Sequence, residues 1–573
     1  MLTCEHAAQL PDMLDSLQES LQHGLHAVGV FDYELGTEMQ DIAPRAQTSP
    51  LACILLFKQC TRLSASQVEA WLAQQDHDTT PSGIAASEES VGEREFSDAI
   101  SRIRDYIEAG DTYQVNYTYR IRFDAFGAPL ALYRRLRSRQ PVPYGALITF
   151  PDGRTVLSLS PELFVRHEQG SIVTRPMKGT APATGDGQQD AGRAQALAAD
   201  PKNRAENLMI VDLLRNDLGR IATVGSVSVP HLFQVERFGS VLQMTSTIQA
   251  KLRNDATLAE IFVALYPCGS ITGAPKRRTI QIIRELEADA RGVYTGAIGW
   301  FDAPEPGQAV GDFCLSVPIR TLMLQAPGSD GIRKGEIGVG AGIVHDSQAA
   351  QEFAECRLKA SFLTGLPNEF ELIETLYATQ EGCRHLDLHL QRLRGSAMYF
   401  GFGFDEMQLR ERIAQACLSM NNGPHRLRIA LRRNGACVLQ SAPLAPLQEP
   451  VRVLLAEERT DARDLFLRHK TSVRERYDKA WRAAEAQGAF DMLFCNVDGE
   501  LTEGARSNVF LKLDGRWYTP PLSSGVLPGI MRTVLLADPV WNAEERRLFP
   551  DDLRRAQEIV VCNALRGALR ALL

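Results

Sequence analysis

Lys178 is the residue of this chain whose surroundings best suit covalent chemistry. It stands in RPMKGT (175–180), a glycine-terminated turn after a run of strand-forming residues. A lysine held there and partly removed from water can act as a nucleophile, because loss of hydration favours the neutral amine. Lys-Gly-Thr turns are more often solvated loops, so the segment predicts a nucleophile only if other reactive residues converge on it.

Two acidic residues on separate helix-like segments are candidate ligands for a hard cation. Glu206 belongs to KNRAENLMIVDLLRNDLGR (202–220) and Glu355 to SQAAQEFAECRLKASFL (347–363). Mg²⁺ takes one or two protein carboxylates and completes its octahedron with waters and substrate oxygens. By spacing alone, the more common outcome is a surface ion pair between Glu355 and Lys359, one helical turn apart.

Two glycine-rich segments, GSITGAPK (269–276) and GVGAGIV (338–344), each follow an apolar run and are typical of turns. Successive backbone N–H groups in such turns can form a concave anion site. A dicarboxylate substrate would find donors there. Tight turns between buried strands explain the same residues equally well.

A second lysine stands in a setting of its own near the end of the chain. Lys470 lies in LRHKTS beside Arg468 and His469, whose charge is expected to make the lysine more acidic. Glu503 opens EGARSNVF, a polar turn that leads into a strand. A lysine and a carboxylate are the groups that pyridoxal phosphate chemistry most needs. Each segment alone is more often a basic loop or an exposed turn.

The elements that must position these residues follow from patterning. Amphipathic spacing predicts a helix from Phe96 to a glycine cap at Gly110, followed by a strand. The polar tract 75–95 predicts an exposed linker. LTGLPNE (363–369) predicts a domain boundary, because enough chain follows it for an independent domain. APLAPLQEPV (442–451) predicts a hinge between two lobes.

Composition bounds the class of protein. A chain of 573 residues exceeds the size of one core, so at least two domains are expected. A net charge of −8 with 44% hydrophobic and 23% charged residues argues against nucleic acid or an anionic membrane as partner. Eleven scattered cysteines without a CxxC pair, and the lack of any signal-like or membrane-spanning run, predict a cytoplasmic protein without a zinc site.

An ordered set of segments resembles the motifs of the chorismate-binding enzymes and spans residues 95–362. These segments are QVNYT (114–118), SPELF (160–164), RPMKGT (175–180), AENLMIVDLLRNDLGR (205–220), GSITGAPKRRTIQII (269–283), RGVYTGAIG (291–299), IRT (319–321) and GAGIVHDSQAAQEFAE (340–355). Lysine at position 178 is typical of the family's aminodeoxychorismate synthases, where anthranilate synthases usually have alanine. The resemblance implies chorismate as substrate.

The resemblance also implies roles for single residues. Lys178 would add to C2 of chorismate and expel the C4 hydroxyl, which Glu162 would protonate as a general acid. Ammonia would then add at C4, and Lys178 would leave. Glu206 and Glu355 would bind Mg²⁺, which also grips the ring carboxylate. The substrate carboxylates would be held by the backbone of Gly179, Thr180, Gly340 and Gly342, by Tyr294, and by a charge-assisted pair with Arg320.

One position departs from the family pattern. Gln243, in VLQMTST (241–247), stands where many members have histidine. In anthranilate synthases that histidine is associated with the steps leading to pyruvate loss, so its absence favours a synthase that stops at the aminated diene. The sequence shows no Cys/His/Glu segment of a glutamine amidotransferase, so ammonia would come free or from a separate amidotransferase subunit.

The rest of the chain, residues 370–573, resembles the fold type IV pyridoxal phosphate enzymes. The segments that carry this resemblance are IETL (373–376), HLDLHLQRLRGSA (385–397), RHKT (468–471), LTEGARSNVF (501–510), GVLPGIMR (525–532) and CNALRG (562–567). The resemblance implies Lys470 as the Schiff-base lysine, Glu503 as partner of the pyridine nitrogen and Arg392 as a phosphate ligand. Two phosphate-cradling turns would contain Ile530 and Met531, and Asn563 and Ala564.

Together these resemblances predict an α+β protein in two domains. Residues 1–363, with an N-terminal portion 1–92 and a core 93–363, would form an aminodeoxychorismate synthase built on large antiparallel sheets. Residues 369–573 would form a two-lobed lyase that eliminates pyruvate to give 4-aminobenzoate. Fold type IV enzymes are commonly dimers, so the resemblance also implies a homodimer through this domain. Fusion to the synthase is what favours a lyase over an aminotransferase.

Two alternatives stay open from the sequence. In one, an anthranilate or isochorismate-type synthase is fused to a branched-chain or D-amino acid aminotransferase-like domain, which Lys178 disfavours. In the other, one half has lost activity and serves a binding or regulatory role. The N-terminal portion stands where related synthases can bind a regulatory amino acid.

Overall fold

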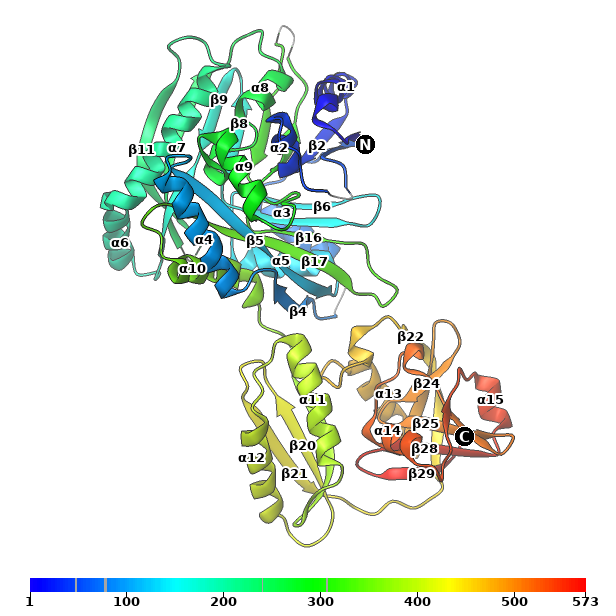
Figure 1. Ribbon diagram of the computed structural model, residues 1–573. Coiled ribbons are helices and arrows are strands. Elements are labelled where there is room, and N and C mark those ends of the chain that lie inside the picture. Colours follow the sequence, from blue (N-terminus) through cyan, green and yellow to red (C-terminus); the bar gives the residue numbers. More distant parts are fainter. Residues whose placement is uncertain (47–48, 77–79, 240, 306–307) are drawn as a thin grey trace.

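A computed structural model of the chain describes residues 1–46, 49–76, 80–239, 241–305 and 308–573. Figure 1 shows two parts, joined by the short segment between helix α10 (Ala349–Thr364) and strand β18 (Leu372–Thr379). The first part contains two sheets whose strand pairs are antiparallel, and the second contains two further sheets. The predicted α+β class with large antiparallel sheets is confirmed.

The first sheet carries Lys178 at one end. Its strands run in the order β1 (Leu2–Cys4), β3 (Ala52–Phe57), β2 (His26–Phe31), β14 (Ala297–Phe301), β15 (Phe313–Ser316), β8 (Leu163–Glu168), β9 (Ser171–Arg175), β12 (Val241–Lys251) and β10 (Met177–Pro182), and β11 (Ser228–Phe238) also pairs with β12. The N-terminal strands therefore share one sheet with the strand that bears the lysine.

The second sheet shares a hydrophobic core with the first. It contains, in order, β13 (Gly273–Ala274), β5 (Gln114–Phe126), β17 (Arg333–Ile343), β16 (Thr321–Leu324), β7 (Thr155–Ser160) and β6 (Tyr144–Thr149), with β4 (Gly83–Glu89) also paired to β5. Helices surround the two sheets in Figure 1. They are α1 (Leu10–Gln22), α2 (Tyr33–Met39), α3 (Ala65–Gln75), α4 (Glu93–Glu108), α5 (Pro129–Arg139), α6 (Gly187–Ala199), α7 (Pro201–Gly219), α8 (Leu258–Leu265), α9 (Lys276–Leu286) and α10.

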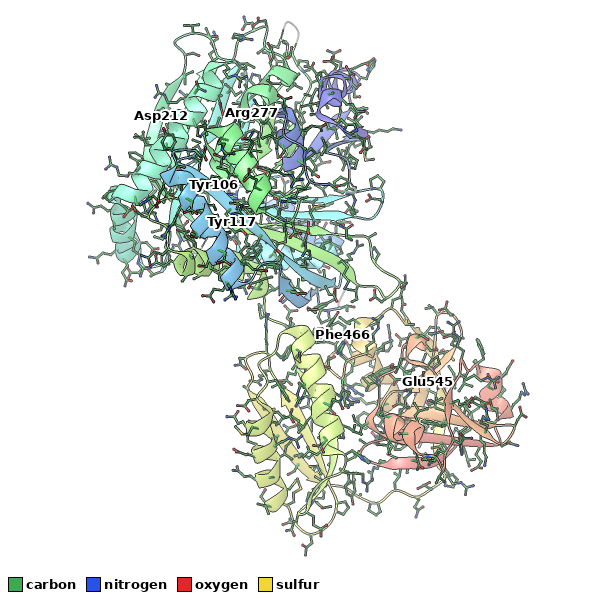
Figure 2. All side chains as sticks on the ribbon, viewed as in Figure 1. Tyr106, Tyr117, Asp212, Arg277, Phe466 and Glu545 are labelled. Carbon is green, nitrogen blue, oxygen red and sulfur yellow. The ribbon has the colours of Figure 1, made fainter. Side chains whose placement is uncertain are left out.

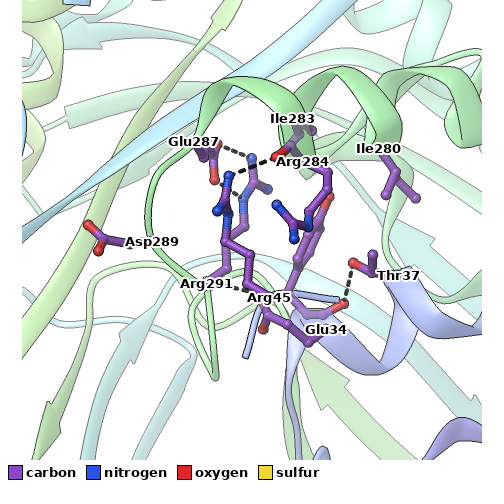
Figure 3. A pocket seen from close by; sticks show the side chains of 10 residues that line it. Glu34, Thr37, Arg45, Ile280, Ile283, Arg284, Glu287, Asp289 and Arg291 are labelled. Carbon is purple, nitrogen blue, oxygen red and sulfur yellow. Dashed lines mark hydrogen bonds and ion pairs between the residues drawn. The ribbon is translucent and has the colours of Figure 1, made fainter. Parts of the chain in front are cut away.

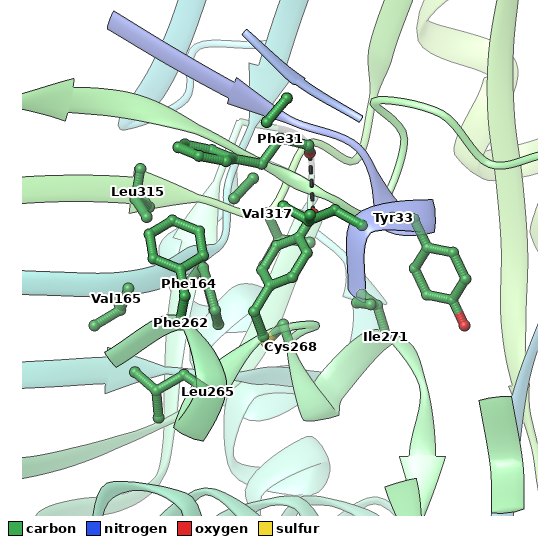
Figure 4. Close-up of a cluster of buried hydrophobic side chains, with 14 of the residues drawn as sticks. Phe31, Tyr33, Phe164, Val165, Phe262, Leu265, Cys268, Ile271, Leu315 and Val317 are labelled. Carbon is green, nitrogen blue, oxygen red and sulfur yellow. Dashed lines mark hydrogen bonds between the residues drawn. The ribbon is translucent and has the colours of Figure 1, made fainter. Parts of the chain in front are cut away.

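An aromatic cluster fixes β8 against the N-terminal strands (Figure 4). The Phe31 ring packs 4.7 Å from that of Phe262, and the Phe164 ring 6.0 Å from that of Tyr266. The Tyr266 hydroxyl donates to the Phe31 carbonyl at 3.1 Å. Because Glu162 immediately precedes β8, this packing fixes the backbone from which the Glu162 side chain projects.

Helix α4 confirms the predicted amphipathic helix. Its buried stripe includes Phe96, Ile100 and Ile103, and Gly110 follows its end with φ at 80°. The helix begins at Glu93, because the Glu95 carboxylate accepts the Gly92 N–H at 2.9 Å and caps the first turn.

The tract 75–95 was wrongly predicted as an exposed linker. Within it, β4 pairs with β5 and buries Ile84 and Ala85, and α4 has already begun at Glu93. The polar composition of the tract did not reveal the short buried run Gly83–Ala85 at the start of β4, because the rest of that strand is exposed or half-buried. Residues 77–79 of this tract lie outside the described residues.

The second part has two lobes. The first lobe holds a sheet of β19 (Gly382–Cys383), β18, β20 (His425–Leu431) and β21 (Cys437–Pro443) with helices α11 (Leu386–Phe400) and α12 (Glu406–Leu418). The chain then crosses to the second lobe through 444–450, within the segment predicted as a hinge.

The second lobe is a sheet that closes on itself. Its strands run β24 (Leu501–Gly504), β23 (Asp491–Asn496), β22 (Val451–Thr460), β29 (Gly567–Leu572), β28 (Glu558–Asn563), β25 (Asn508–Leu513), β26 (Arg516–Thr519) and β27 (Glu544–Glu545), and β24 also pairs with β25. Helices α13 (Glu475–Ala486), α14 (Ile530–Ala537) and α15 (Pro550–Arg555) lie around it.

The two parts share a hydrophobic cluster. Phe466, labelled in Figure 2, lies where the parts meet. The members contributed by the first part are Ala85, Phe126 and Ile332, and those from the second include Phe370, Phe400 and Phe466. None of the helices in the described ranges is long and apolar enough to cross a membrane.

Candidate active sites

Lys178 lies in a strand, not in the predicted turn. In β10, Lys178 pairs with Met244 of β12 and Thr180 pairs with Gln243, so Gly179 is an extra residue that forms a β-bulge. Gly179 has φ at 77°, and a Cβ there would lie 2.7 Å from Oδ1 of Asn203 in α7. Glycine is therefore required both for the left-handed backbone and for the close approach of α7.

The Lys178 amine reaches across to the second sheet. A Cβ on Gly342 of β17 would lie only 3.3 Å from Nζ of Lys178. Burial lowers the pKa of Lys178, against the opposing influence of the Glu206 and Glu162 carboxylates. The setting favours a neutral amine, which is the nucleophilic form.

The surroundings of Glu162 favour the acid form expected of a proton donor. Its side chain is 4% exposed, and burial raises the pKa of the carboxyl, opposed by a hydrogen bond from Ser270 and by the charge of Lys178. The Ser270 hydroxyl donates to Oε1 at 2.6 Å. Ser270 comes from the segment 269–276, so that predicted turn contributes a side-chain donor to Glu162.

Carboxylates from two helices converge beside Lys178. Burial raises the pKa of Glu206 on α7, and the carboxylates of Glu352 and Glu355 on α10 raise it further, against Lys178 and Lys202. For Glu355, burial would raise the pKa, but Lys359 and more distant lysines hold it below its ordinary value. Glu206 and Glu355 therefore interact electrostatically with each other and with Lys178.

The predicted ion pair between Glu355 and Lys359 is also present, at 2.8 Å. The same Lys359 amine donates to the Gly340 carbonyl at 2.9 Å, which ties α10 to β17. Across the described ranges, no three acidic, histidine or cysteine side chains are grouped as a complete metal site. Two carboxylates fit Mg²⁺ in the mode in which water and substrate supply its other ligands.

The segment 338–344 was wrongly predicted as a turn. Residues 338–343 belong to β17 and pair with β5, Gly340 opposite Thr118 and Gly342 opposite Asn116. A Cβ on Gly340 would lie 2.5 Å from the Tyr117 carbonyl. These glycines allow close packing of backbone and side chains, and the strand ladder engages much of their backbone.

Gln114 was not predicted as a functional residue. It opens β5 at 0% exposure, and neither atom of its amide has a hydrogen-bond partner among the described residues. A Cβ on Gly342 would lie 2.6 Å from its Nε2. Gln114 and the Lys178 amine therefore flank the same glycine. The feature of the sequence that could have pointed to Gln114 is a polar residue at the start of a predicted strand.

Tyr294 and Arg320, predicted to hold carboxylates, differ in their surroundings. Tyr294 is 8% exposed, with the Arg120 guanidinium 5.1 Å from its ring centroid. Burial lowers the pKa of Arg320 to about 10. The described part of the chain places no carboxylate within ion-pair distance of Arg320, whose φ is 53°.

Gln243 lies on β12, directly opposite the strand that carries Lys178. It is paired with Thr180, and its Nε2 donates weakly to the Thr180 hydroxyl at 3.4 Å. Its Oε1 is buried without a hydrogen-bond partner in the described ranges. The residue that replaces the family's usual histidine thus contacts a predicted substrate-binding residue.

A small cavity of about 20 Å³ lies between α2 and α9 (Figure 3), apart from either lysine. At its wall, the Arg291 guanidinium forms a buried 2.6 Å ion pair with Glu287. Arg291 also donates to the carbonyls of Ile271 at 3.0 Å and Asn116 at 2.6 Å. This network fixes the segment that carries Ser270 against β5.

Lys470 lies where the two lobes of the second part meet. The Ile373 N–H donates to the Lys470 carbonyl at 2.9 Å, which fixes the lysine beside β18. Burial lowers the pKa of Lys470 to about 7, and the guanidinium groups of Arg474 and Arg392 lower it too, against Glu374 and Glu503. Lys470 is more acidic than normal, as predicted, but the cations that act on it are Arg474, in the same stretch of chain, and Arg392 of α11, in place of Arg468 and His469.

Glu503 is buried in β24 and is not an exposed turn residue. Its Oε2 accepts the Leu527 N–H and the Asn508 amide, each at 3.0 Å, and its Oε1 accepts the Tyr477 hydroxyl at 3.0 Å. Burial raises the pKa of Glu503 to about 7, opposed by the hydrogen bonds from Leu527 and Tyr477 and by the charge of Lys470. Glu503 and Lys470 interact electrostatically, so the two predicted groups are brought together.

Arg392 and the predicted phosphate turns are linked through Pro528. The guanidinium of Arg392 binds Glu374 at two points, 2.8 and 2.6 Å, and donates to the Pro528 carbonyl at 3.0 Å. Arg392 holds the pKa of Glu374 down to about 2, against burial. Pro528 lies two residues before Ile530, the first residue of α14.

The first turn of α14 supplies backbone donors. Ile530 and Met531 begin this helix, where N–H groups are free of intrahelical partners and the helix dipole favours an anion. On the second predicted turn, Asn563 Oδ1 accepts the Arg566 N–H at 2.8 Å, and Ala564 is 8% exposed. A cationic side chain, a helix start and a small-residue turn suit a phosphate group.

Comparison with known proteins agrees with this division of the chain. Residues 3–365 match the chorismate binding enzyme family, and residues 371–572 match the amino-transferase class IV family. The aminodeoxychorismate synthase component 1 of Klebsiella aerogenes is 37% identical over 349 residues, 57% of this chain and 74% of that protein.

Relatives of the first part carry more than one name. An anthranilate synthase component 1 of Haloarcula marismortui is 38% identical over 285 residues, 50% of this chain and 56% of that protein. The crystal structure of anthranilate synthase component I from Streptococcus pneumoniae is 29% identical with a TM-score of 0.50, covering 61% of this chain and 85% of that one. Since the family match at 3–365 covers more than half of the sequence, the chain belongs to the chorismate-binding enzyme family.

Proposed function

We propose that this chain makes 4-aminobenzoate from chorismate and ammonia in two steps, one in each part. The observation that carries the first step is the reach of the Lys178 amine across to Gly342 of the second sheet, where burial lowers its pKa and the carboxyls of Glu162 and Glu206 interact with it. A neutral amine and a protonated acid beside it are the two groups needed to replace a hydroxyl on a ring. Domains of residues 1–363 and 369–573 would each hold one site.

In the first step, Lys178 acts as the nucleophile and Glu162 as the general acid. The Nζ of Lys178 bonds to C2 of chorismate, both ring double bonds shift by one position, and the C4 hydroxyl leaves as water with the proton of Glu162. Ammonia then bonds to C4, both double bonds shift back, and the bond from C2 to the lysine nitrogen breaks to release the neutral amine. The Glu162 carboxylate takes the proton that the new C4 amine loses. The product is 4-amino-4-deoxychorismate.

The surrounding residues would hold the substrate's two carboxylates. Glu206 and Glu355 would bind Mg²⁺, whose charge offsets that of the ring carboxylate. Arg320, on which no carboxylate of the described ranges acts, would pair with the substrate's second carboxylate. The backbone of Gly179, Thr180, Gly340 and Gly342, with Tyr294, would complete the binding surface.

In the second step, the residues of the second part hold pyridoxal phosphate, which when bound supplies an electron sink for cleavage beside an amine-bearing carbon. Lys470 would hold the cofactor and move protons, and Glu503 would pair with its ring nitrogen. Arg392, with backbone donors of Ile530, Met531, Asn563 and Ala564, would bind its phosphate. Elimination of pyruvate leaves 4-aminobenzoate, because loss of the side chain makes the ring aromatic.

A lyase is favoured over an aminotransferase by the fusion itself. Enzymes that catalyse several different reactions share the class IV family. A domain fused to an aminodeoxychorismate synthase, however, is supplied with 4-amino-4-deoxychorismate, the substrate of the lyase. Ammonia would come from solution or from a separate amidotransferase subunit. The protein would act in the cytoplasm, as a homodimer formed through its second part.

Covalent trapping tests the first step. The protein is mixed with chorismate and Mg²⁺ without ammonia, quenched and digested. The proposal predicts a peptide that contains Lys178 and gains the mass of chorismate minus water. Absence of that adduct from a protein that aminates chorismate normally when ammonium is added would count against Lys178 as nucleophile.

A further inference from the structure

The segment that ends in Lys470 lies against the first part of the chain. Residues 465–470 are here called the Lys470 segment. Its Phe466 ring packs edge-on to that of Phe126 in β5, with ring centroids 5.8 Å apart and planes at 87°. Phe466 is 7% exposed, and Figure 2 shows it at the junction of the two parts. One end of the segment is thus buried in the shared cluster.

Polar contacts hold the middle of the same segment. The Arg468 guanidinium donates to the Asp330 carbonyl at 2.8 Å, from the loop that joins β16 and β17. A Cβ on the next residue, Gly331, would lie 2.7 Å from the Arg463 carbonyl, so the two backbones touch. The loop before β17 therefore packs along the approach to Lys470.

The residue next to Lys470 is held by a linked set of side chains. The His469 ring stacks on Tyr399 with centroids 5.0 Å apart and an 11° angle between planes. The Tyr399 hydroxyl donates to Oδ2 of Asp124 in β5 at 3.1 Å. On its other side, His469 Nδ1 lies 2.9 Å from the Ser396 hydroxyl. Asp124 thereby connects to Lys470 through two side chains.

We propose that Asp124 and Tyr399 are positioning residues for Lys470, so that the first part of the chain helps to build the cofactor site of the second. The inference rests on the proposed role of Lys470 in holding pyridoxal phosphate. His469 precedes Lys470 in the backbone, so its ring orientation limits the directions open to the lysine side chain. The Tyr399 ring sets that orientation, and Asp124 fixes the Tyr399 ring.

The groups around His469 make this contact one of packing and not of charge. Its neighbours include Arg468, Tyr399, Ser396 and Phe400, whose ring centroid lies 4.8 Å away. Burial, with a smaller contribution from Arg468, lowers the pKa of His469 to about 4, so the ring is neutral near pH 7. The stack is therefore insensitive to pH in the neutral range.

The test uses the full chain with Tyr399→Phe, Asp124→Ala and the double variant. Tyr399→Phe keeps the ring and removes only the hydroxyl. A first control is Tyr106→Phe, which removes a matched tyrosine–carboxylate bond of 2.6 Å to Glu285 away from the junction. A second is Lys334→Ala, which removes the other partner of Asp124, at 2.5 Å, and leaves the bond to Tyr399.

Two quantities are measured on each protein: the dissociation constant for pyridoxal phosphate, and the pH midpoint of the bound cofactor's absorbance. We expect each single variant to weaken binding by about threefold to tenfold, a typical coupling for contacting residues, and to shift the midpoint. The double variant should be no weaker than the worse single variant, because both remove one connection. The controls should match the wild type.

The outcomes separate this inference from the proposed function. A wild-type chain that takes up no pyridoxal phosphate would overturn the role of Lys470 itself. The positioning role alone would be overturned by a different result. In that result the wild type binds pyridoxal phosphate, and Tyr399→Phe and Asp124→Ala have the same dissociation constant and the same pH midpoint as Tyr106→Phe. The rate of chorismate amination in the same samples reports whether the first part stays folded.

Discussion

Ser270 donates a 2.6 Å hydrogen bond to the carboxyl group of Glu162, in a site where burial already raises the pKa of that carboxyl. A donor stabilises the charged form, so Ser270 moderates the effect of burial. Glu162 can then be protonated before the reaction and still release its proton to the leaving hydroxyl. Removing the Ser270 hydroxyl should therefore shift the pKa of Glu162 in a direction that can be measured.

Ser270→Ala should raise the pKa of Glu162 further. Because the protonated form is the active one, amination by the wild type falls as the pH rises through this pKa, and the alkaline limb should move to higher pH in the variant. The measurement is the pH profile of the amination rate. Glu162→Gln should lower that rate by about 10²–10⁴-fold at every pH. A limb that moves to lower pH in Ser270→Ala would contradict the assignment.

Gly342→Ala should impair amination without unfolding the protein. The new methyl group would lie 2.6 Å from Nε2 of Gln114 and 3.3 Å from Nζ of Lys178, both of them ends of flexible side chains. These side chains can move, so the fold survives while the reacting groups are displaced. We expect at least a tenfold loss in rate, since small displacements of reacting groups are costly.

The matched control for this change is Gly187→Ala at the start of α6, where a Cβ meets no atom within 4 Å. It should leave the amination rate unchanged. If the two alanine variants were equally active, Gly342 would not border the reacting amine.

Glu503→Gln should stabilise the protein that lacks pyridoxal phosphate, but only at higher pH. Burial raises the pKa of Glu503 from 4.5 to about 7. Since the folded-state pKa lies above the unfolded one, this carboxyl's stabilising contribution is complete below about pH 4.5 and is lost as the pH rises to about 7. Glutamine stays neutral and loses nothing over this interval.

Unfolding in denaturant at pH 5 and pH 8 measures this difference. Relative to the wild type, the free energy of unfolding of Glu503→Gln should be larger at pH 8 than at pH 5 by about 1–3 kcal/mol. The same variant should lose lyase activity, because a neutral amide cannot form the charge-assisted bond to a protonated ring nitrogen. A variant equally stable relative to wild type at both pH values would show that Glu503 does not titrate in this range.

Arg392→Lys should weaken binding of pyridoxal phosphate by about tenfold or more, since a lysine cannot reproduce two-point hydrogen bonding by a charged fork. The lysine would also lose the contact to the Pro528 carbonyl ahead of α14. The control is Arg394→Lys on the same helix, where the arginine is half exposed and pairs with Glu406. Equal cofactor affinities in the two variants would remove Arg392 from the phosphate site.

Sequence patterning was sufficient for elements whose signals are local. The stripe of Phe96, Ile100 and Ile103 and the cap at Gly110 defined α4, and the acidic segments around Glu206 and Glu355 were both helices. The α+β class came from ordered motifs and not from periodicity. Charged side chains on helices could therefore be assigned to elements in advance.

Positions set by distant packing could not be predicted in this way. Gly179 and Gly342 suggested turns, yet one is a bulge and the other lies inside a strand, because their small size serves neighbours from other elements. The acidity of Lys470 depends on Arg392 and Arg474, which the fold brings together. Gln114 was missed because its importance lies in an unpaired buried amide, which only tertiary structure reveals.

The central claim is that one chain turns chorismate into 4-aminobenzoate through Lys178 and then Lys470. Its most direct test is identification of products by mass spectrometry after incubation of the wild type, Lys178→Ala and Lys470→Ala with chorismate, Mg²⁺, ammonium and pyridoxal phosphate. The wild type should give 4-aminobenzoate and pyruvate, Lys470→Ala should accumulate 4-amino-4-deoxychorismate, and Lys178→Ala should give neither. Anthranilate from the wild type, or aminodeoxychorismate that the wild type leaves unconsumed, would contradict the account.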